Sequence, residues 1–307
     1  MSLAFISHSD VGRHDNGWNH PEHVGRIRAI TRAMRYHPDL FMALEHIEGR
    51  HATADELALA HGREYIERVR AMSEAGGGRF DADTVVSEGS WDAATAAAGS
   101  VIEAVERSLD GRNVRSFVGV RPPGHHALRD RAMGFCLFGS VAIGAHVARR
   151  RGVERVLIVD WDVHHGNGTQ ALVEGDPGIR FVSMHQWPWY PGTGAAEDRG
   201  PHENVWNVPM PPGLAAERYR DALLAAVDTA TRGWTPGLVL ISAGFDSLAG
   251  DPLGGFTLEL ADVRALTRAL VERAERWCEG RVVSALEGGY DPDRLGDAVI
   301  AHLEALR

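Results

Sequence analysis

The chain has 307 residues and no lysine, so all 32 of its basic residues are arginines. This absence excludes a P-loop lysine, a kinase lysine and a Schiff-base amine for pyridoxal phosphate or a carbonyl substrate. Cysteine is scarce too: Cys136 and Cys278 are too few for a disulfide framework or a cysteine-based zinc site. Reducing surroundings are therefore expected.

Long apolar runs are also missing, and none approaches the length of a membrane span. The apolar start at residues 3–6 is too short for a signal-peptide core. We therefore expect a cytoplasmic protein with no membrane partner. The net charge of -10 disfavours a general nucleic-acid binder as well. The oligomeric state stays open, a homo-oligomer included.

The chain has the composition of a globular protein, with 44% hydrophobic and 24% charged residues. From residue 116 onward, apolar runs typical of strands alternate with amphipathic helical patterns, and no linker interrupts them. This rhythm predicts one α/β domain over residues 1–307, with a central, mostly parallel sheet and helices on both faces. Strands are expected at 3–6, 116–120, 156–159, 179–185, 238–242 and 281–286, helices at 24–36, 64–72, 91–109, 215–232, 258–278 and 293–306, and a long loop at 76–90.

The stretch at 155–169 carries the most chemistry. Four aliphatic residues predict a strand buried on both faces, and Asp160, Asp162 and His164 follow at a spacing of two. In extended backbone such residues point to the same side, at the strand end where open α/β sheets bind ligands. Capping acids and a surface histidine in a βα loop are the alternative.

A single metal ion would find its best ligands in Asp162, His164 and Asp246, which all follow predicted strands. Three protein ligands with one position left open are typical of catalytic zinc. The same nitrogen and oxygen atoms also suit iron(II), cobalt or manganese. We expect such an ion to polarise a carbonyl group and to acidify a bound water.

Other polar residues follow the neighbouring strands. His125 and His126 offer imidazoles to act as a base, and Asp160 and Asn167 could fix their tautomers. Tyr290 could donate a hydrogen bond to an oxyanion. Each of these residues alone could be structural, and it is their convergence at adjacent strand ends that favours function.

The first loop is unusually rich in histidine. Any one of its four histidines could be a surface residue, whereas the group as a whole could line a site entrance. The residues concerned are His8, His14, His20 and His23.

Several motifs together resemble the zinc-dependent histone deacetylase superfamily over nearly the whole chain. The likeness is greatest to class II members and their bacterial amidohydrolase relatives, because Asn167 stands where class I enzymes carry Asp. The motifs are His20-Pro21-Glu22, Arg26-Ile27, Arg121-Pro122-Pro123-Gly124-His125-His126-Ala127, Gly134-Phe135-Cys136, 160–170, 243–246 with 250–254, and Glu287-Gly288-Gly289-Tyr290.

The resemblance implies an arginase-deacetylase fold, with its active site at the carboxyl ends of the strands, and hydrolysis of an N-acetyl amide on an amine side chain. It implies one Zn2+ per chain on Asp162, His164 and Asp246. It further implies that His126 is the general base and acid, His125 its electrostatic partner and Tyr290 the hydroxyl that polarises the carbonyl.

Further roles follow from the resemblance alone. A structural K+ would be bound by Asp160, Asp162, His164, Ser183 and Met184. An acyl-lysine tunnel would be formed by Gly134, Phe135, Tyr190 and Leu253. Acetate release would involve Arg26, Gly288 and Gly289.

The substrate is expected to be an acylated amine, with acetyl-lysine favoured over acetylpolyamines. Leu253 stands where a specialised polyamine deacetylase carries Glu, and Leu cannot attract a second ammonium group. Tyr190 stands where Phe is commoner and keeps an aromatic wall.

Three other functions remain as alternatives: an acetylpolyamine deacetylase, a binuclear ureohydrolase of the arginase type and a non-enzymatic acyl-amine sensor or scaffold. A serine hydrolase is disfavoured, because the chain has no Gly-x-Ser-x-Gly elbow.

Overall fold

The computed structural model describes residues 3–307. Its centre is an eight-stranded sheet with the order β2-β1-β5-β10-β9-β6-β7-β8, in which every pairing is parallel. The strands are β1 Leu3–Ser7, β2 Glu45–Glu48, β5 Arg115–Val118, β6 Val156–Asp160, β7 Ile179–Gln186, β8 Val205–Met210, β9 Leu238–Ala243 and β10 Val282–Leu286.

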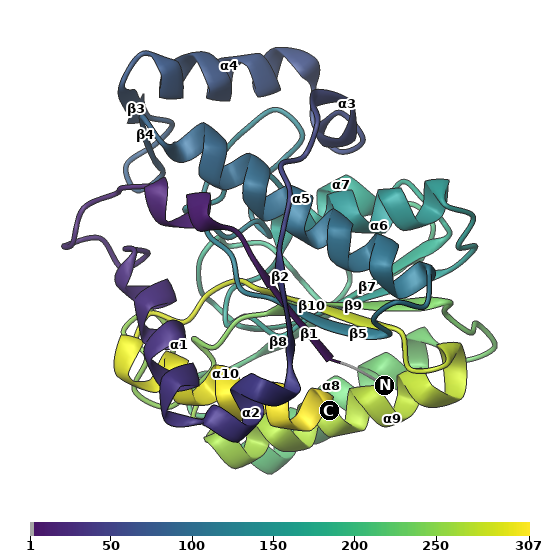
Figure 1. Ribbon diagram of the computed structural model, residues 1–307. Coiled ribbons are helices and arrows are strands. Elements are labelled where there is room, and N and C mark those ends of the chain that lie inside the picture. The colour runs from purple at the N-terminus through teal and green to yellow at the C-terminus, as the bar shows by residue number, and fades with distance from the viewer. Residues whose placement is uncertain (1–2) are drawn as a thin grey trace.

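Helices cover both faces of the sheet, as the sequence predicts, so the expected α/β architecture is confirmed (Figure 1). One face carries α1 Gly25–Tyr36, α2 Pro38–Ala43, α8 Ala216–Ala230, α9 Leu260–Cys278 and α10 Pro292–Leu306. The other carries α3 Ala54–Leu57, α4 Arg63–Glu74, α5 Ser90–Leu109, α6 Ser140–Arg150 and α7 Asn167–Val173. Among residues 3–307, no helix combines the length and the apolar composition that crossing a bilayer requires.

Strand β6 shows why the sheet is buried on both sides. Leu157 and Val159 belong to the hydrophobic cluster on one face, and Val156 and Ile158 to the cluster on the other. All four side chains are fully buried. A run of aliphatic residues without polar alternation is what a central parallel strand needs, because helices pack on each of its faces.

The structure differs from the sequence prediction in the long loop and at both edges of the sheet. Within the predicted loop at 76–90, β3 Gly77–Arg79 and β4 Val85–Ser87 form an antiparallel hairpin. Strands β2 and β8 were not predicted. Both are edge strands, and an edge strand is covered on fewer sides and so lacks a continuous apolar run.

A further correction concerns the backbone after β6. The strand ends at Asp160, so the extended alternation expected through Asp162 and His164 is wrong. Residues 162–164 bend instead, and Asp160 Oδ2 contacts His125 Nδ1.

Candidate active site

Four adjacent strands in the middle of the sheet deliver the candidate catalytic residues. In spatial order β5, β10, β9 and β6 are neighbours, and the segments after them carry His125 and His126, Tyr290, Asp246, and Asp162 with His164. Since parallel strands share one carboxyl edge, residues far apart in the sequence meet there.

Asp162, His164 and Asp246 form a buried cluster whose ligand atoms all lie within 4.8 Å of one another. His164 Nδ1 is 2.9 Å from Asp162 Oδ1 and 3.3 Å from Asp246 Oδ2. The other carboxylate oxygens accept backbone hydrogen bonds: Asp162 Oδ2 from Gly288 N and Asp246 Oδ1 from Val163 N. Asp246 Oδ2 is fully buried and has no hydrogen-bond partner.

The electrostatics of this cluster favour a cation. Burial and the adjacent charge of Asp162 raise the pKa of Asp246 to about 7. Burial lowers the pKa of His164, but the adjacent carboxylates of Asp162 and Asp246 outweigh burial and raise that pKa to about 10. Two buried carboxylates and one imidazole, with one oxygen unpaired, therefore fit a divalent metal ion.

The two histidines after β5 have different partners. His125 Nδ1 lies 3.1 Å from Asp160 Oδ2, whereas His126 Nδ1 lies 2.8 Å from Asn167 Oδ1. Burial lowers the pKa of His125, but Asp162 and Asp160 outweigh it, and the pKa lies well above its usual value. Burial and the neighbouring His125 and His164 hold the pKa of His126 well below its usual value. These environments favour the charged form of His125 and the neutral form of His126.

Backbone contacts hold this pair in place. Glu287, just after β10, accepts hydrogen bonds from the backbone N–H groups of Gly124 and His125 at 2.6 and 3.1 Å. Asn167 Nδ2 donates to Met133 Sδ at 3.5 Å, and this contact orients the Asn167 amide. Asn167 Oδ1 thus accepts from His126 Nδ1, which leaves the lone pair of the neutral ring on Nε2.

Tyr290 completes the group. Its backbone N–H donates to Asp251 Oδ2 at 2.7 Å, and its ring packs 5.7 Å from that of Phe135. Burial and the charges of Asp162 and Asp246 raise the pKa of its phenol well above the usual value. The hydroxyl therefore keeps its proton and can act as a donor.

A cavity of about 220 Å³ opens onto these groups. All four residues expected to form the tunnel line it, together with His126, His164 and Tyr290. Gly134 lies at φ 54°, where a Cβ would come within 2.4 Å of the His126 ring, so glycine is required there. Asp83 and Trp189 also line the cavity. Asp83 was missed, because a hairpin residue carries no periodic signal, whereas the sequence favoured a core or loop anchor over a cavity wall for Trp189.

Comparison with known protein families identifies the chain. The family model described as "Histone deacetylase domain" matches residues 20–306. The chain belongs to the histone deacetylase family.

Relatives within this family are found in bacteria and archaea. A histone deacetylase-like amidohydrolase of Pseudomonas aeruginosa is 40% identical over 83% of this chain and 70% of its own length. A probable deacetylase of Archaeoglobus fulgidus is 33% identical over 94% of this chain and 82% of its own. The crystal structure of the HDA15 HD domain superposes with a TM-score of 0.94 at 34% identity, covering 99% of this chain and 88% of that one.

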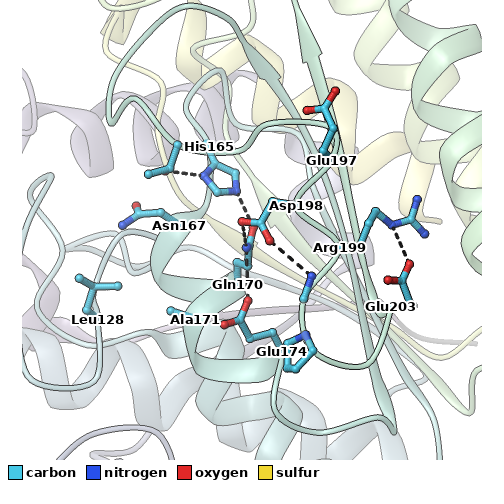
Figure 2. Close-up of a pocket in the computed structure, with 13 residues that line it drawn as sticks. Leu128, His165, Asn167, Gln170, Ala171, Glu174, Glu197, Asp198, Arg199 and Glu203 are labelled. Atoms are coloured by element: carbon cyan, nitrogen blue, oxygen red, sulfur yellow. Dashed lines mark hydrogen bonds and ion pairs between the residues drawn. The ribbon is translucent and has the colours of Figure 1, made fainter.

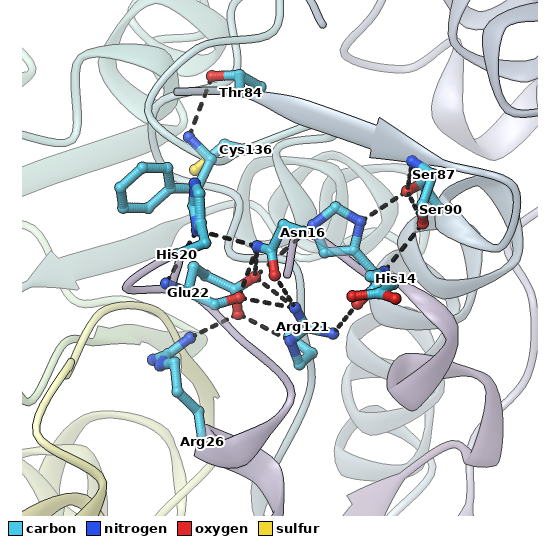
Figure 3. A network of polar contacts seen from close by, with 12 residues as sticks. His14, Asn16, His20, Glu22, Arg26, Thr84, Ser87, Ser90, Arg121 and Cys136 are labelled. Atoms are coloured by element: carbon cyan, nitrogen blue, oxygen red, sulfur yellow. Dashed lines mark hydrogen bonds and ion pairs between the residues drawn. The ribbon is translucent and has the colours of Figure 1, made fainter. Parts of the chain in front are cut away.

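A buried ionic network lies behind the active site of this deacetylase-family chain (Figure 3). Glu22 is fully buried between Arg26 and Arg121, with the closest contacts at 3.0 and 2.8 Å. Arg26 in turn donates to Gly289 O at 2.7 Å and lies 5.0 Å from the centre of the Tyr290 ring. The first loop is thereby tied to the segment that carries the tyrosine.

The histidines of the first loop do not act as one group. His20 alone reaches the cavity wall, where its ring lies 4.6 Å from that of Phe135. His14 is buried against Ser90 and the network around Glu22, and His8 lies in a separate cluster with Asp10 and His51. The expectation of a histidine-lined entrance therefore holds for His20 only.

A separate and larger groove, of about 600 Å³, has Asn167 among the residues that line it (Figure 2). Its polar side chains bind one another: His165 contacts Thr193 and Gln170, and Gln170 donates to Asp198 at 2.8 Å. Burial and the neighbouring His185 lower the pKa of His165 to about 3, so this histidine is neutral and engaged on both nitrogens. The reactive groups face the smaller cavity.

Proposed function

We propose that this chain is a zinc-dependent deacetylase that removes an acetyl or short acyl group from an amine side chain. The observation that carries the proposal is that His126, Tyr290 and His164 line one 220 Å³ cavity, and that His164 belongs to the buried cluster with two carboxylates. An amide hydrolase needs a cation, a base and an oxyanion donor at one carbonyl.

Asp162, His164 and Asp246 would hold the zinc ion, which when bound supplies a Lewis acid for the carbonyl and for water. His126 Nε2 carries the lone pair that accepts a proton, because Asn167 fixes the proton on Nδ1. The same nitrogen can then deliver that proton to the leaving amine. His125, charged and paired with Asp160, stabilises negative charge nearby.

Tyr290 donates its hydroxyl proton toward the carbonyl oxygen as charge develops there. Phe135, Tyr190 and Trp189 give the cavity apolar walls that suit an uncharged alkyl chain and exclude water. Arg26, Gly288 and Gly289 are proposed for acetate release, in line with the contact between Arg26 and Gly289 O.

A structural K+ is proposed beside the cluster. Asp160 and Ser183 are register partners on β6 and β7, and both are fully buried. Together with the backbone carbonyls of Asp162, His164 and Met184, they would supply the oxygen ligands that a hard cation prefers.

Acetyl-lysine-like substrates are favoured, and acetylpolyamines are the second candidate. Leu253 at the cavity rim gives no charge for a second ammonium group. Asp83, however, places a carboxylate on the same lining, which favours the alternative. An arginase-type site fits less well, because Asp160 contacts His125 rather than joining the other two aspartates as a bridging ligand.

The experiment is a substrate screen on protein of defined metal content, with acetylated peptides, acetylpolyamines and short-chain acyl-lysines compared by kcat/KM. The proposal expects amide hydrolysis that is lost on metal removal and restored by zinc. Asp83→Asn should raise KM for acetylpolyamines alone if that carboxylate binds their distal ammonium. Full activity in metal-free protein, or two manganese ions per chain with urea release from guanidino substrates, would contradict the proposal.

The roles of the two histidines need a separate comparison. His126→Ala should lower kcat by about 10²–10⁴-fold, the usual contribution of a general base. If His125→Ala abolishes turnover while His126→Ala is mild, the two roles are the reverse of those assigned.

A further inference from the structure

A second group of potential metal ligands lies outside the catalytic cavity. His8 follows β1, Asp10 lies in the 3-10 helix η1 Ser9–Arg13, and His51 lies between β2 and α3. One ligand atom from each lies within 4.8 Å of the others. Strands β1 and β2 are parallel neighbours, so these residues meet at the carboxyl edge of the sheet, as the catalytic residues do further along it.

The hydrogen bonds of His51 indicate which of its nitrogens is free. The Thr95 hydroxyl lies 2.8 Å from Trp91 O and 3.1 Å from Asp92 O, and a carbonyl oxygen can only accept. The hydroxyl has one proton, and when it donates that proton to either carbonyl, Thr95 Oγ1 accepts from His51 Nδ1, at 2.8 Å. In the neutral ring, Nε2 must then carry a lone pair.

That lone pair faces a carboxylate oxygen. His51 Nε2 is 3.1 Å from Asp10 Oδ2, and two acceptors at this distance repel each other unless a cation lies between them. Either a proton or a metal ion satisfies this contact. The side chain of His51 is 42% exposed, so an ion can reach it from solvent.

His8 supplies a second nitrogen to the same oxygen. Its Nδ1 accepts the backbone N–H of Asp10 and lies 3.8 Å from Asp10 Oδ2, and its ring lies 4.6 Å from that of His51. An ion bound at Nδ1 would replace the hydrogen bond from the Asp10 N–H, because the ring has only one lone pair there. Two ligands of one tetrahedral zinc are about 3.3 Å apart, given metal–ligand bonds of about 2.0–2.1 Å. The distance from Asp10 Oδ2 to His51 Nε2, 3.1 Å, is slightly shorter than that separation, and the distance to His8 Nδ1, 3.8 Å, is slightly longer.

Charged groups of both signs surround the cluster. Arg13 lies nearest to Asp10 Oδ1, at 3.6 Å, and hydrogen-bonds to Asp92, which leaves Asp10 Oδ2 to the histidines. A second carboxylate, that of Glu48, lies 3.9 Å from His8 Nε2. Two imidazoles and a carboxylate suit zinc, nickel, cobalt or copper rather than magnesium or calcium.

We propose that His8, Asp10 and His51 bind a second divalent transition-metal ion, with zinc as the expected metal. The ion would join η1 to the segment before α3. Because η1 leads into the loop that carries His14, His20 and Glu22, the ion would fasten the start of that loop without contacting the catalytic cavity. The proposal is independent of the proposed reaction.

The experiment separates the two sites by mutation. Asp246→Asn removes a catalytic ligand, and zinc binding to the stripped full-length chain is then measured by elemental analysis after equilibrium dialysis. The proposal expects one zinc equivalent to remain. Adding His51→Ala, or separately His8→Ala, should remove it, whereas adding His202→Ala at an exposed histidine elsewhere should not.

A graded variant distinguishes a metal site from a charged pair. Thr95→Val deletes the acceptor that orients His51, and should weaken zinc binding by about 10–100-fold while the fold is retained by circular dichroism. With Asp246 intact, His51→Ala should lose one zinc equivalent and keep deacetylase activity. If Asp246→Asn binds no zinc, or His51→Ala binds as much as its parent, His51 is simply a protonated partner of Asp10 and the proposal is overturned.

Discussion

His125 and His126 show how far the environment decides what a residue does. They are adjacent in the sequence, yet one faces the carboxylate of Asp160 and the other the neutral amide of Asn167. The charge of the partner carboxylate favours an imidazolium, and an amide oxygen does not. One charged and one neutral imidazole thus arise side by side.

Tyr290 gives the clearest single-residue prediction. Replacing Tyr290 by Phe removes one hydroxyl and leaves the packing against Phe135 and Arg26 in place. We expect kcat to fall by about 10²–10³-fold, the usual cost of losing an oxyanion donor, while the zinc content of the protein stays unchanged. Steady-state kinetics alongside metal analysis provides the test. Turnover equal to that of the unchanged protein would remove Tyr290 from the mechanism.

At the scale of elements, the end of β10 lies against the proposed metal ligands. Gly288 N donates to Asp162 Oδ2 at 2.8 Å, and a Cβ on Gly288 would lie 2.0 Å from Asp246 Oδ2. A side chain there would displace a ligand oxygen, so only glycine lets the β10 and β9 ends approach this closely.

Gly288→Ala should therefore weaken zinc binding by about 10–100-fold, because it moves the ligands and disturbs a hydrogen bond that orients them. Zinc affinity measured by competition with a chelator is the readout. Gly175→Ala is the matched control, since a Cβ at Gly175 meets nothing within 4 Å. Equal affinities in the two variants would show that the close approach of β10 is unimportant.

The loop between η1 and α1 depends on Glu22. Its carboxylate pairs with the buried guanidinium groups of Arg26 and Arg121 (Figure 3). Burial raises the pKa of Glu22, but the charges of Arg121 and Arg26 outweigh burial and lower that pKa to about 2. The side chain is therefore ionised throughout the neutral range.

Glu22→Gln should lower the free energy of unfolding by about 3–5 kcal/mol, because it leaves two buried positive charges without their counterion. Urea unfolding measures the change. Glu74→Gln, which breaks only an exposed pair with Arg70, should cost far less, because water screens that pair. Similar values for the two variants would contradict a stabilising role for the buried network.

For the whole molecule, buried histidines set the response to acid. Burial and the charge of Arg121 lower the pKa of His14 to about 4, and burial lowers the pKa of His61 to about 4 and that of His302 to about 3. Each histidine binds a proton more readily in the unfolded chain. Its neutral, buried form therefore contributes fully to the free energy of unfolding above pH 6.5, and this contribution is lost as the pH falls toward the folded-state pKa.

At pH 5 each such histidine should cost roughly 2 kcal/mol relative to pH 7. His302 is the best one to test, because among residues 3–307 its ring nitrogens bond only to Thr267 and Ser284 and it does not line the cavity. His302→Gln should reduce the slope of the unfolding free energy against pH, between pH 6.5 and 4.5, by the amount that corresponds to about one bound proton. Parallel pH profiles for the two proteins would contradict this assignment.

Much of the fold could be predicted because central strands carry a strong pattern. The apolar runs of β6, β9 and β10 are buried on both faces, and their lengths agree with prediction to within a residue or so. Strand β2 has the sequence Glu-His-Ile-Glu and lies at an edge, so nothing in its composition distinguishes it from a loop. The hairpin β3–β4 is short and glycine-rich, and it was missed for a similar reason.

The sequence by itself determined the α/β class and the residue types available to a metal, a base and an oxyanion donor. It did so because ligand residues follow apolar strands directly, and parallel strands share one carboxyl edge. Only the tertiary structure decided which groups are in contact: Asp160 with His125, Glu22 between two arginines, Asp83 on the cavity wall, and His51 beside His8 and Asp10. These partners are far apart in the chain or lie in bent segments without periodicity, so burial and packing, rather than spacing, fix their distances.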